Sequence, residues 1–192
     1  MAVPPPAFSM TDKRALRATA RATRDSFVAA GAPALPCPRE FVALLAPGLV
    51  VASYAPIGSE ADPAALEAAA RAANCRLALP HVVDRATPIR FLAWEAEHAL
   101  SDGPFGLRQP DGGHTAIVPD LVLTPLVAFD ASLNRIGQGA GHYDRAFAAY
   151  PAARRIGIAW SVQQLDSITP DPWDAPLDAI VTEHGWISGQ PR

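Results

Sequence analysis

The segment "PDLVLTPLVAFDASLNRIGQGAGHYDRAFAAYPAARRIGIAW", residues 119–160, decides the fold. Its first part, "DLVLTPLVAFD", is an apolar run that predicts a strand broken at Pro125. Glycines then stand at every second position, and "GHYDRAFAAY" predicts a helix that begins at this glycine-rich turn. "RRIGIAW" predicts another strand. A strand, a helix and a strand in this order are typical of a parallel sheet.

The rest of the chain continues this alternation. Apolar runs predict further strands at residues 49–57, 76–80, 89–94 and 178–183, and helical patterns occupy residues 9–31, 39–46 and 62–74. We therefore expect an α/β fold, with a mostly parallel sheet and helices on both faces. In such folds ligands bind at the carboxyl ends of the strands. The loops expected to meet there follow Tyr54, Trp94, Phe129 and Trp160.

Length and charge limit the classes of protein. The chain has 192 residues, 49% of them hydrophobic, so we expect one core and a single domain over residues 1–192. Residues 1–8, which include three consecutive prolines, are expected to form a flexible lead-in. Lys plus Arg total 16 against 19 Asp plus Glu, a net charge of -3, which argues against a global basic field. We expect a monomer that binds no nucleic acid.

The cysteines and the apolar runs indicate the cellular compartment of the protein. Cys37 and Cys75 lack the spacing of a disulfide framework or a zinc site, so we expect reduced thiols. The N-terminus has neither the basic nor the long apolar region of a secretory signal. The uncharged run at 41–58 is interrupted by prolines and glycine, and we interpret it as a helix end followed by a buried strand. A cytoplasmic protein without a membrane segment is expected.

The glycine stretch is the first candidate for binding chemistry. Backbone N–H groups of residues 137–141, followed by a helix N-terminus, can converge on a phosphate, and Arg135 can add a charged donor. The GxGxG spacing lacks the third glycine of a dinucleotide fingerprint and the GK[ST] ending of a P-loop. A plain tight turn or hairpin is the alternative. Asp144, in the first turn of the helix, either stabilises the helix dipole or holds Mg²⁺ beside phosphates.

A basic helix face is the second candidate. Lys13, Arg17, Arg21 and Arg24 fall within one arc of a helix, with Arg14 to one side. Such a run is most often a solvated face. The other interpretation is that Lys13 and Arg17, in the first turns, fold over the phosphates of a nucleotide.

Glu60 and several aromatic residues are the third candidate. Glu60 lies between a buried strand and a helix, where it either caps the helix or accepts hydrogen bonds from ring N–H groups of a heterocycle. Flat side chains at strand ends belong either to the core or to a pocket: Tyr54, Phe91, Trp94, Phe105 and Trp160. The absence of HExxH and GxSxG motifs disfavours the hydrolases that use them.

Several motifs occur together in an order that resembles a known family. They are "KRALR", "YAPIGSEADP", "LPHVVDRATPIRFLAWE", "GPFGLRQP", the block around the glycines, "IGIAWSVQQLDSI" and "PLDAIVTE". Across nearly the whole chain they resemble the 5-formyltetrahydrofolate cyclo-ligase family. The resemblance implies a three-layer NagB/RpiA/CoA-transferase-like fold and ATP-dependent cyclisation of 5-formyltetrahydrofolate to 5,10-methenyltetrahydrofolate, with release of ADP and phosphate and with Mg²⁺ as cofactor.

The resemblance also implies roles for individual residues. ATP binding is implied for Lys13, Arg14, Arg17, Arg135, Gly137, Gln138, Gly139, Ala140, Gly141, His142 and Tyr143. Folate binding is implied for Tyr54, Glu60, Trp94, Gly139, His142 and Tyr143. Lys13 and Arg135 are the implied catalytic residues, and Asp144 and Asp178 the implied magnesium ligands. His142 stands where the family commonly has a tyrosine.

The implied mechanism needs no protein nucleophile, which agrees with the lack of a nucleophile and base motif. ATP would phosphorylate the N5-formyl oxygen, N10 would attack the activated carbon, and phosphate would leave, while the protein positions the substrates and neutralises charge. Two other classes remain open. One is a related α/β enzyme that acts on sugar phosphates or CoA esters without ATP, and the other is a sensor that binds nucleotide or folate without turnover.

Overall fold

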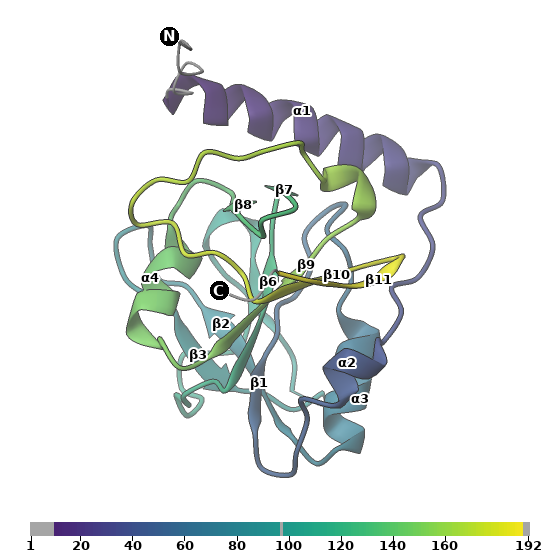
Figure 1. The fold of residues 1–192 in the computed structure, drawn as a ribbon. Helices are drawn as coiled ribbons and strands as arrows, with labels where there is room; N and C mark the ends of the chain where they lie inside the picture. The colour runs from purple at the N-terminus through teal and green to yellow at the C-terminus, as the bar shows by residue number, and fades with distance from the viewer. Residues whose placement is uncertain (1–9, 97, 190–192) are drawn as a thin grey trace, which may run out of the picture.

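A seven-stranded sheet runs through the centre of the molecule (Figure 1). The computed structural model describes residues 10–96 and 98–189, so the expected lead-in at residues 1–8 lies outside the described residues. The strand order is β11-β10-β9-β6-β1-β2-β3. The strands are β1 (Val50–Ala52), β2 (Arg76–His81), β3 (Arg90–Ala93), β6 (Leu121–Pro125), β9 (Arg154–Ile158), β10 (Ala179–Thr182) and β11 (Gly185–Ser188).

The five inner strands are parallel, as the alternation of strands and helices predicted. β1 pairs in parallel with β2 and β6, so that Val51 stands between Leu77 and Leu121. β6 pairs in parallel with β9, and β9 with β10. The two edge strands, β3 and β11, are antiparallel to their neighbours. The prediction of a mostly parallel α/β sheet is therefore confirmed.

The direction of β3 corrects one expectation. The loops after Tyr54, Trp94, Phe129 and Trp160 were expected at one edge of the sheet. Because β3 is antiparallel to β2, with Ala78 opposite Ala93, its carboxyl end lies at the amino edge of the parallel strands. Trp94, which follows β3, is thus at the opposite edge from the loop that follows β1.

Helices cover both faces of the sheet, which gives the three layers expected (Figure 1). On one face, α4 (His142–Ala149) buries Ala146 and Phe147 against sheet residues that include Val122. On the other face, α2 (Arg39–Val42) and α3 (Ala64–Ala72) bury Phe41 and Leu66 in a second core. α2 is only one turn long, whereas a helix over residues 39–46 was predicted.

The first helix, α1 (Met10–Ala29), lies across the end of the sheet rather than on a face, at the top of Figure 1. It packs against the short helix η2 (Ser161–Gln163). Ala20 belongs to a third apolar cluster with Val127 and Ile136. The basic residues of α1 are thereby brought to the carboxyl edge of the sheet, where ligands bind in folds of this kind.

Two small hairpins complete that edge. β4 (Ser101–Asp102) and β5 (Arg108–Gln109) flank the 3-10 turn η1 (Pro104–Gly106). The predicted strand "DLVLTPLVAFD" ends at Pro125, and β7 (Ala128–Phe129) pairs instead with β8 (Arg135–Ile136). Asp130 fixes this second hairpin, because its carboxylate accepts hydrogen bonds from Ser132, Asn134 and Ile168. The glycine stretch follows β8 and leads into α4.

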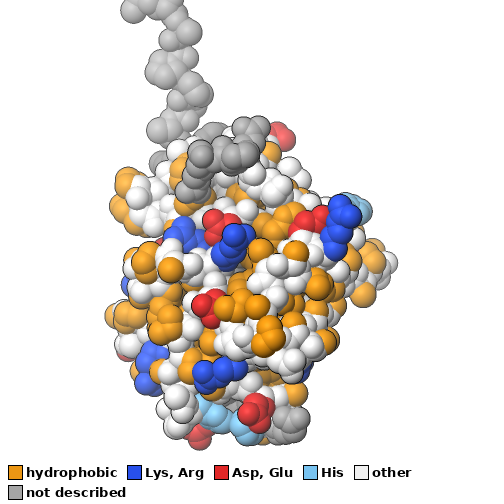
Figure 2. Space-filling view, turned by 60° about the horizontal axis from the view of Figure 1, so that its bottom comes forward, with side chains coloured by type: hydrophobic (Ala, Val, Ile, Leu, Met, Phe, Trp, Pro, Cys, Tyr) orange, Lys and Arg blue, Asp and Glu red, His pale blue; other side chains and the backbone are white. Residues whose placement is uncertain are grey.

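The surface carries mixed charge on the face drawn in Figure 2, where acidic and basic side chains are interspersed among apolar ones. Within residues 10–96 and 98–189, no helix has the length and apolar character needed to cross a membrane.

Candidate functional site

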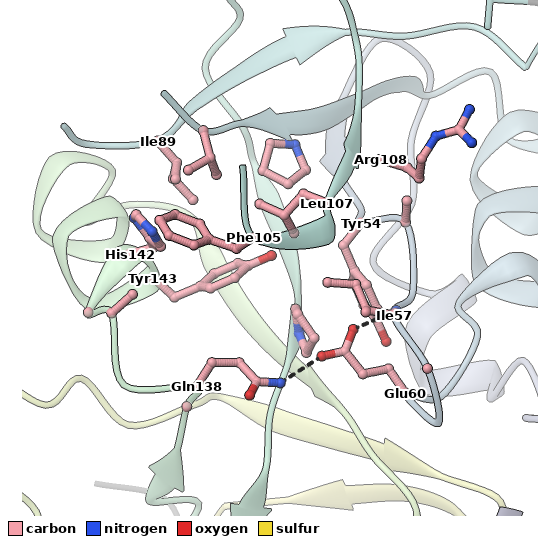
Figure 3. A pocket seen from close by; sticks show the side chains of 18 of the residues that line it. Tyr54, Ile57, Glu60, Ile89, Phe105, Leu107, Arg108, Gln138, His142 and Tyr143 are labelled. Carbon is pink, nitrogen blue, oxygen red and sulfur yellow. Dashed lines mark hydrogen bonds between the residues drawn. The ribbon is translucent and has the colours of Figure 1, made fainter. Parts of the chain in front are cut away.

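A cavity of about 450 Å³ opens at the carboxyl edge of the sheet (Figure 3). Its walls come from α1, the loop after β1, the β4–β5 hairpin, the glycine stretch and the first turn of α4. Ile89, Phe105 and Leu107 supply apolar surface, and Arg135, Glu60 and Asp144 supply charge. An apolar cavity with a few convergent polar groups is the usual form of a small-molecule site.

The glycine stretch borders this cavity and turns directly into a helix. Gly141 is the N-cap residue of α4 and has φ 67°, in the left-handed region that glycine adopts at little cost. Gly139 has φ 100°, which strains any side chain at that position. Among residues 137–144, all except Gly139 line the cavity. The predicted helix start at the glycine-rich turn is confirmed.

Arg135 and Asp144 form an ion pair in the cavity wall. An Nη2 group of Arg135 donates to Oδ1 of Asp144 at 2.5 Å, and only 4% of the arginine side chain is exposed. The guanidinium also lies over the Phe147 ring at 5.1 Å. Burial lowers the pKa of Arg135, although the charges of Asp144 and Asp174 oppose the shift, and an arginine stays charged in proteins. Its buried Nε has no hydrogen-bond partner among the described residues.

Glu60 and Gln138 are joined across the mouth of the cavity. Oε1 of Glu60 accepts from Nε2 of Gln138 at 3.0 Å, and Oε2 accepts from the backbone N–H of Ile57 at 3.0 Å (Figure 3). Gln138 in turn accepts a hydrogen bond from Arg21. Glu60 is therefore held by its own loop and by the glycine stretch, with its carboxylate at the cavity rather than on a helix cap.

Two tyrosines line the cavity as neutral hydroxyl groups. Burial raises the pKa of Tyr54 and of Tyr143, and the charge of Glu60 raises both further. The hydroxyl of Tyr54 donates to the carbonyl oxygen of Ala61. The hydroxyl of Tyr143 points into the cavity, between Phe105 and Tyr54 (Figure 3). Both hydroxyl groups keep their proton at neutral pH. Because Tyr54 already donates its proton to Ala61, the Tyr143 hydroxyl is the one that can donate to a ligand.

His142 lines the cavity as a neutral imidazole. Its Nδ1 faces an Nη2 group of Arg145 at 3.2 Å, and since arginine can only donate, Nδ1 accepts and the ring proton lies on Nε2. Burial lowers the pKa of His142, and the charges of Arg145 and Arg85 lower it further. Nε2 is buried without a partner among the described residues. It is free to donate to a ligand.

This pKa shift predicts a change in the acid stability of the protein. The folded-state pKa of His142 is below 6.5, so as pH falls through that value the unfolded chain binds a proton that the folded chain does not. The free energy of unfolding should therefore fall. When the pH is lowered from about 7.5 to about 5.5, we expect the free energy of unfolding to fall less in His142→Gln than in the native chain. Urea unfolding at the two pH values measures the difference, and equal losses would contradict it.

The basic residues of α1 differ in their surroundings. The ammonium of Lys13 pairs with Asp171 at 2.6 Å and Asp174 at 2.8 Å. Burial opposes the charge of Lys13, but the two carboxylates outweigh it and raise its pKa. Arg17 donates from Nε to the carbonyl oxygen of Gly137 at 2.9 Å. Neither Lys13 nor Arg17 is among the described residues that line the cavity.

The other basic residues of α1 are Arg14, Arg21 and Arg24. Arg21 lines the cavity and donates to Gln138. Arg14 is exposed and is also absent from the cavity lining among the described residues. Arg24, which the solvated-face interpretation places in water, is only 6% exposed and lines the cavity. The solvated-face interpretation is wrong for Arg24, because the loop after β1 covers it and Ser59 accepts its Nε–H at 2.8 Å.

Two further residues implied by the family resemblance lie at the opposite edge of the sheet from this cavity. Trp94 lines a separate hollow at the other edge of the sheet, where Arg71 lies over its ring at 5.4 Å. Asp178 immediately precedes β10, so it stands at the amino edge of the parallel strands, where it accepts a hydrogen bond from the backbone of Arg155. The structure therefore does not support a pairing of Asp178 with Asp144 as metal ligands.

The aromatic residues left open by the sequence divide between core and cavity. Phe91 is fully buried and Trp160 nearly so, whereas Phe105 and Tyr54 line the cavity. Sequence reasoning missed Asp171 and Asp174, the partners of Lys13. It also missed Arg145, which orients His142. The two carboxylates in "DPWD" could have indicated a cation-binding pair, but no local sequence pattern connects them with residue 13.

The fold and the cavity define a class of protein: an α/β protein in which a glycine-rich turn, a helix N-terminus and a buried arginine line a ligand cavity at the carboxyl edge of the sheet. Residues 42–183 match the 5-formyltetrahydrofolate cyclo-ligase family. The chain belongs to this family, so the resemblance seen in the sequence motifs is confirmed.

Individual relatives agree. The chain is 32% identical to the 5-formyltetrahydrofolate cyclo-ligase of Mycolicibacterium smegmatis over 143 residues, 70% of this chain and 74% of the relative. Identity to that of Haemophilus influenzae is 33% over 97 residues, which span 47% of this chain and about half, 52%, of the relative. The solved structure of 5,10-methenyltetrahydrofolate synthetase from Aquifex aeolicus is 28% identical, with a TM-score of 0.63 over 96% of this chain and 87% of that one.

Proposed function

We propose that this protein cyclises 5-formyltetrahydrofolate to 5,10-methenyltetrahydrofolate with consumption of ATP and release of ADP and phosphate. The proposal rests on one observation: two different polar surfaces line the same cavity. One is the glycine stretch with buried Arg135, and the other is the Glu60 carboxylate. The first suits phosphate, and the second suits the N–H groups of a heterocycle. Membership of the cyclo-ligase family supports it.

The chemistry requires activation of a poor leaving group. Transfer of the γ-phosphoryl group to the formyl oxygen releases ADP and makes that oxygen part of a phosphate leaving group. N10 attacks the formyl carbon and loses its proton to solvent, and phosphate then leaves with the C–O bond electrons. Arg135 is suited to neutralise charge on the transferred group, since it is buried and fixed by Phe147. His142 Nε2 and the Tyr143 hydroxyl can donate to substrate oxygens.

Magnesium is part of the proposal. No group of three or more His, Cys, Asp or Glu side chains in residues 10–96 and 98–189 is arranged to hold a metal ion. Mg²⁺ usually binds proteins through one or two carboxylates together with substrate phosphates, so Asp144 in the cavity wall fits it. Asp174 is the second candidate, because its charge reaches Arg135 and it also bonds Lys13. When bound, the ion supplies neutralisation of phosphate charge.

The ion pairs of Lys13 and Arg135 suggest how a nucleotide would bind. Lys13 is held by Asp171 and Asp174, and Arg135 by Asp144. Triphosphate oxygens can replace these carboxylates as partners of the cations, which frees the carboxylates for a divalent ion.

Lys13→Ala tests the cation that lies outside the cavity lining. We expect the KM for ATP to rise about tenfold to a hundredfold, the equivalent of about 1.5 to 3 kcal/mol for a charged hydrogen bond. Steady-state kinetics at varied ATP measures it. Arg39→Ala is the control for loss of a positive charge, because 94% of that side chain is exposed. Equal, small effects in both variants would leave Lys13 with a structural role only, through its ion pairs with Asp171 and Asp174.

The direct test of the function is incubation with 5-formyltetrahydrofolate and Mg-ATP, with absorbance of the methenyl product as the readout. Product that depends on both ATP and Mg²⁺ supports the proposal. Binding of both ligands without product would favour a sensor. Activity on sugar phosphates or CoA esters without nucleotide would favour the other α/β enzymes. Monomeric state, a cytoplasmic location and a single domain over residues 1–192 stay predictions.

A further inference from the structure

Arg24 has a buried nitrogen without a partner at the cavity. The residue is 6% exposed, and its Nε–H is satisfied by the Ser59 hydroxyl at 2.8 Å. Its Nη1 is buried and has no hydrogen-bond partner among the described residues. Since Arg24 also lines the cavity, a ligand that enters the cavity reaches this guanidinium, which the protein itself leaves with one unpaired nitrogen.

The guanidinium is fixed in this position. The Ser59 hydroxyl that accepts from Arg24 donates in turn to Asp25, and the Ser59 carbonyl oxygen accepts from Nε1 of Trp160 at 3.0 Å. The loop after β1 and the end of α1 are thereby locked together around Arg24. A buried charged donor left unpaired is costly, and native structures rarely leave one without a partner. We therefore expect a hydrogen-bond acceptor on a bound ligand to be the partner of Arg24.

The neighbours of Arg24 indicate which acceptor it meets. Ser59, its anchor, precedes Glu60 in the chain, so the donor and the carboxylate acceptor come from one short segment. The charges of Glu60 and Arg24 both act on the Tyr54 hydroxyl, in opposite directions. This part of the cavity thus presents both an acceptor and a donor near Tyr54. The complementary ligand edge has N–H donors beside a carbonyl oxygen.

We propose that Arg24 is a specificity-determining residue whose guanidinium donates to the 4-oxo oxygen of the pterin ring, while Glu60 accepts from the adjacent ring N–H groups. The inference rests on the proposed function. A pterin has this lactam edge, in which the carbonyl lies beside the ring N3–H and the 2-amino group. A phosphate partner fits Arg24 less well, because the glycine stretch and Arg135 form a separate anion-binding wall.

The test compares two probes without ATP: 5-formyltetrahydrofolate and its 4-amino-4-deoxy counterpart, in which a donor replaces the carbonyl acceptor. Binding is followed by quenching of intrinsic fluorescence or by calorimetry. The quantity compared is the ratio of the Kd of the 4-amino probe to the Kd of the 4-oxo probe. We expect Arg24→Met to lower this ratio at least about tenfold, because it weakens the 4-oxo probe and removes the clash with the 4-amino one.

Two further variants keep the test decisive if Arg24→Met does not fold. Arg24→Lys keeps the charge but loses the planar fork, and Ser59→Ala removes the anchor of Nε, so each should lower the ratio by a smaller factor. Arg39→Met, which removes an exposed arginine on α2, should leave the ratio unchanged. A general loss of folding would weaken both probes alike and would not change the ratio.

The outcomes separate the inference from the proposed function. If the native protein does not bind 5-formyltetrahydrofolate, the proposed function fails. If it binds and the ratio is the same in the native protein and all Arg24 variants, the inference is overturned and the function stands. A rise in the KM for ATP alone in Arg24→Lys would also overturn it, since Arg24 would then meet phosphate.

Discussion

Arg135→Met is expected to reduce kcat/KM by on the order of 10²- to 10³-fold, the loss typical of removing a fixed donor from a developing charge. The reason is its position: the guanidinium is buried in the cavity wall between Asp144 and the Phe147 ring. The same change leaves the Asp144 carboxylate without its partner. We therefore also expect the free energy of unfolding to fall by about 3 kcal/mol.

Arg155→Met is a matched control for this prediction. The guanidinium of Arg155 lies over the same Phe147 ring, at 5.2 Å against 5.1 Å for Arg135. Arg155 is not among the described residues that line the cavity. Its replacement should lower stability while kcat/KM changes by only a few-fold. If both variants lost activity in proportion to their loss of stability, Arg135 would have a structural role only.

Gly139→Ala is expected to impair nucleotide use more than it impairs folding. With φ at 100°, an alanine is strained and should lower the free energy of unfolding by about 1 to 2 kcal/mol. Relief of that strain would shift the glycine stretch, against which Arg17 lies at 3.5 Å from the position of the added Cβ. A shifted glycine stretch would present its backbone N–H groups differently to a bound phosphate. We expect the KM for ATP to rise about tenfold or more.

Gly185→Ala separates strain from ligand binding. Gly185 has φ 111° in the β10–β11 hairpin, has open space around the added Cβ, and does not line the cavity. It should lose a similar amount of stability with no change in KM. Thermal unfolding and ATP kinetics on both variants decide the matter. A Gly139→Ala protein that unfolds early yet uses ATP normally would make the glycine stretch a plain turn.

Local patterns in the sequence determined a large part of this fold. The apolar runs at 49–57, 120–130 and 154–160 alternate with helical segments. That alternation alone predicts parallel strands, because two neighbouring parallel strands need a long crossover connection, which is usually a helix. The glycine-rich turn that begins α4 was visible in the same way, since glycine marks positions that need a positive φ. The ordered motifs identified the family.

Other features depended on strand direction, which local patterns do not encode. An edge strand such as β3 has the same apolar pattern whether it runs parallel or antiparallel to its neighbour. Only the pairing of Ala78 with Ala93 places Trp94 at the far edge of the sheet, away from the cavity. The position of Asp178, one residue before β10, likewise has meaning only once the direction of the strand is known.

The site itself was decided by contacts between distant parts of the chain. The basic arc of α1 determined that cations would lie on one side of that helix, but which of them meets water depends on what the helix packs against. Tertiary structure joins Lys13 to Asp171 and Asp174, more than 150 residues away, and buries Arg24 beneath the loop that carries Ser59. A charge pattern fixes the face of a helix, whereas burial and the choice of ion-pair partner are properties of the packed molecule.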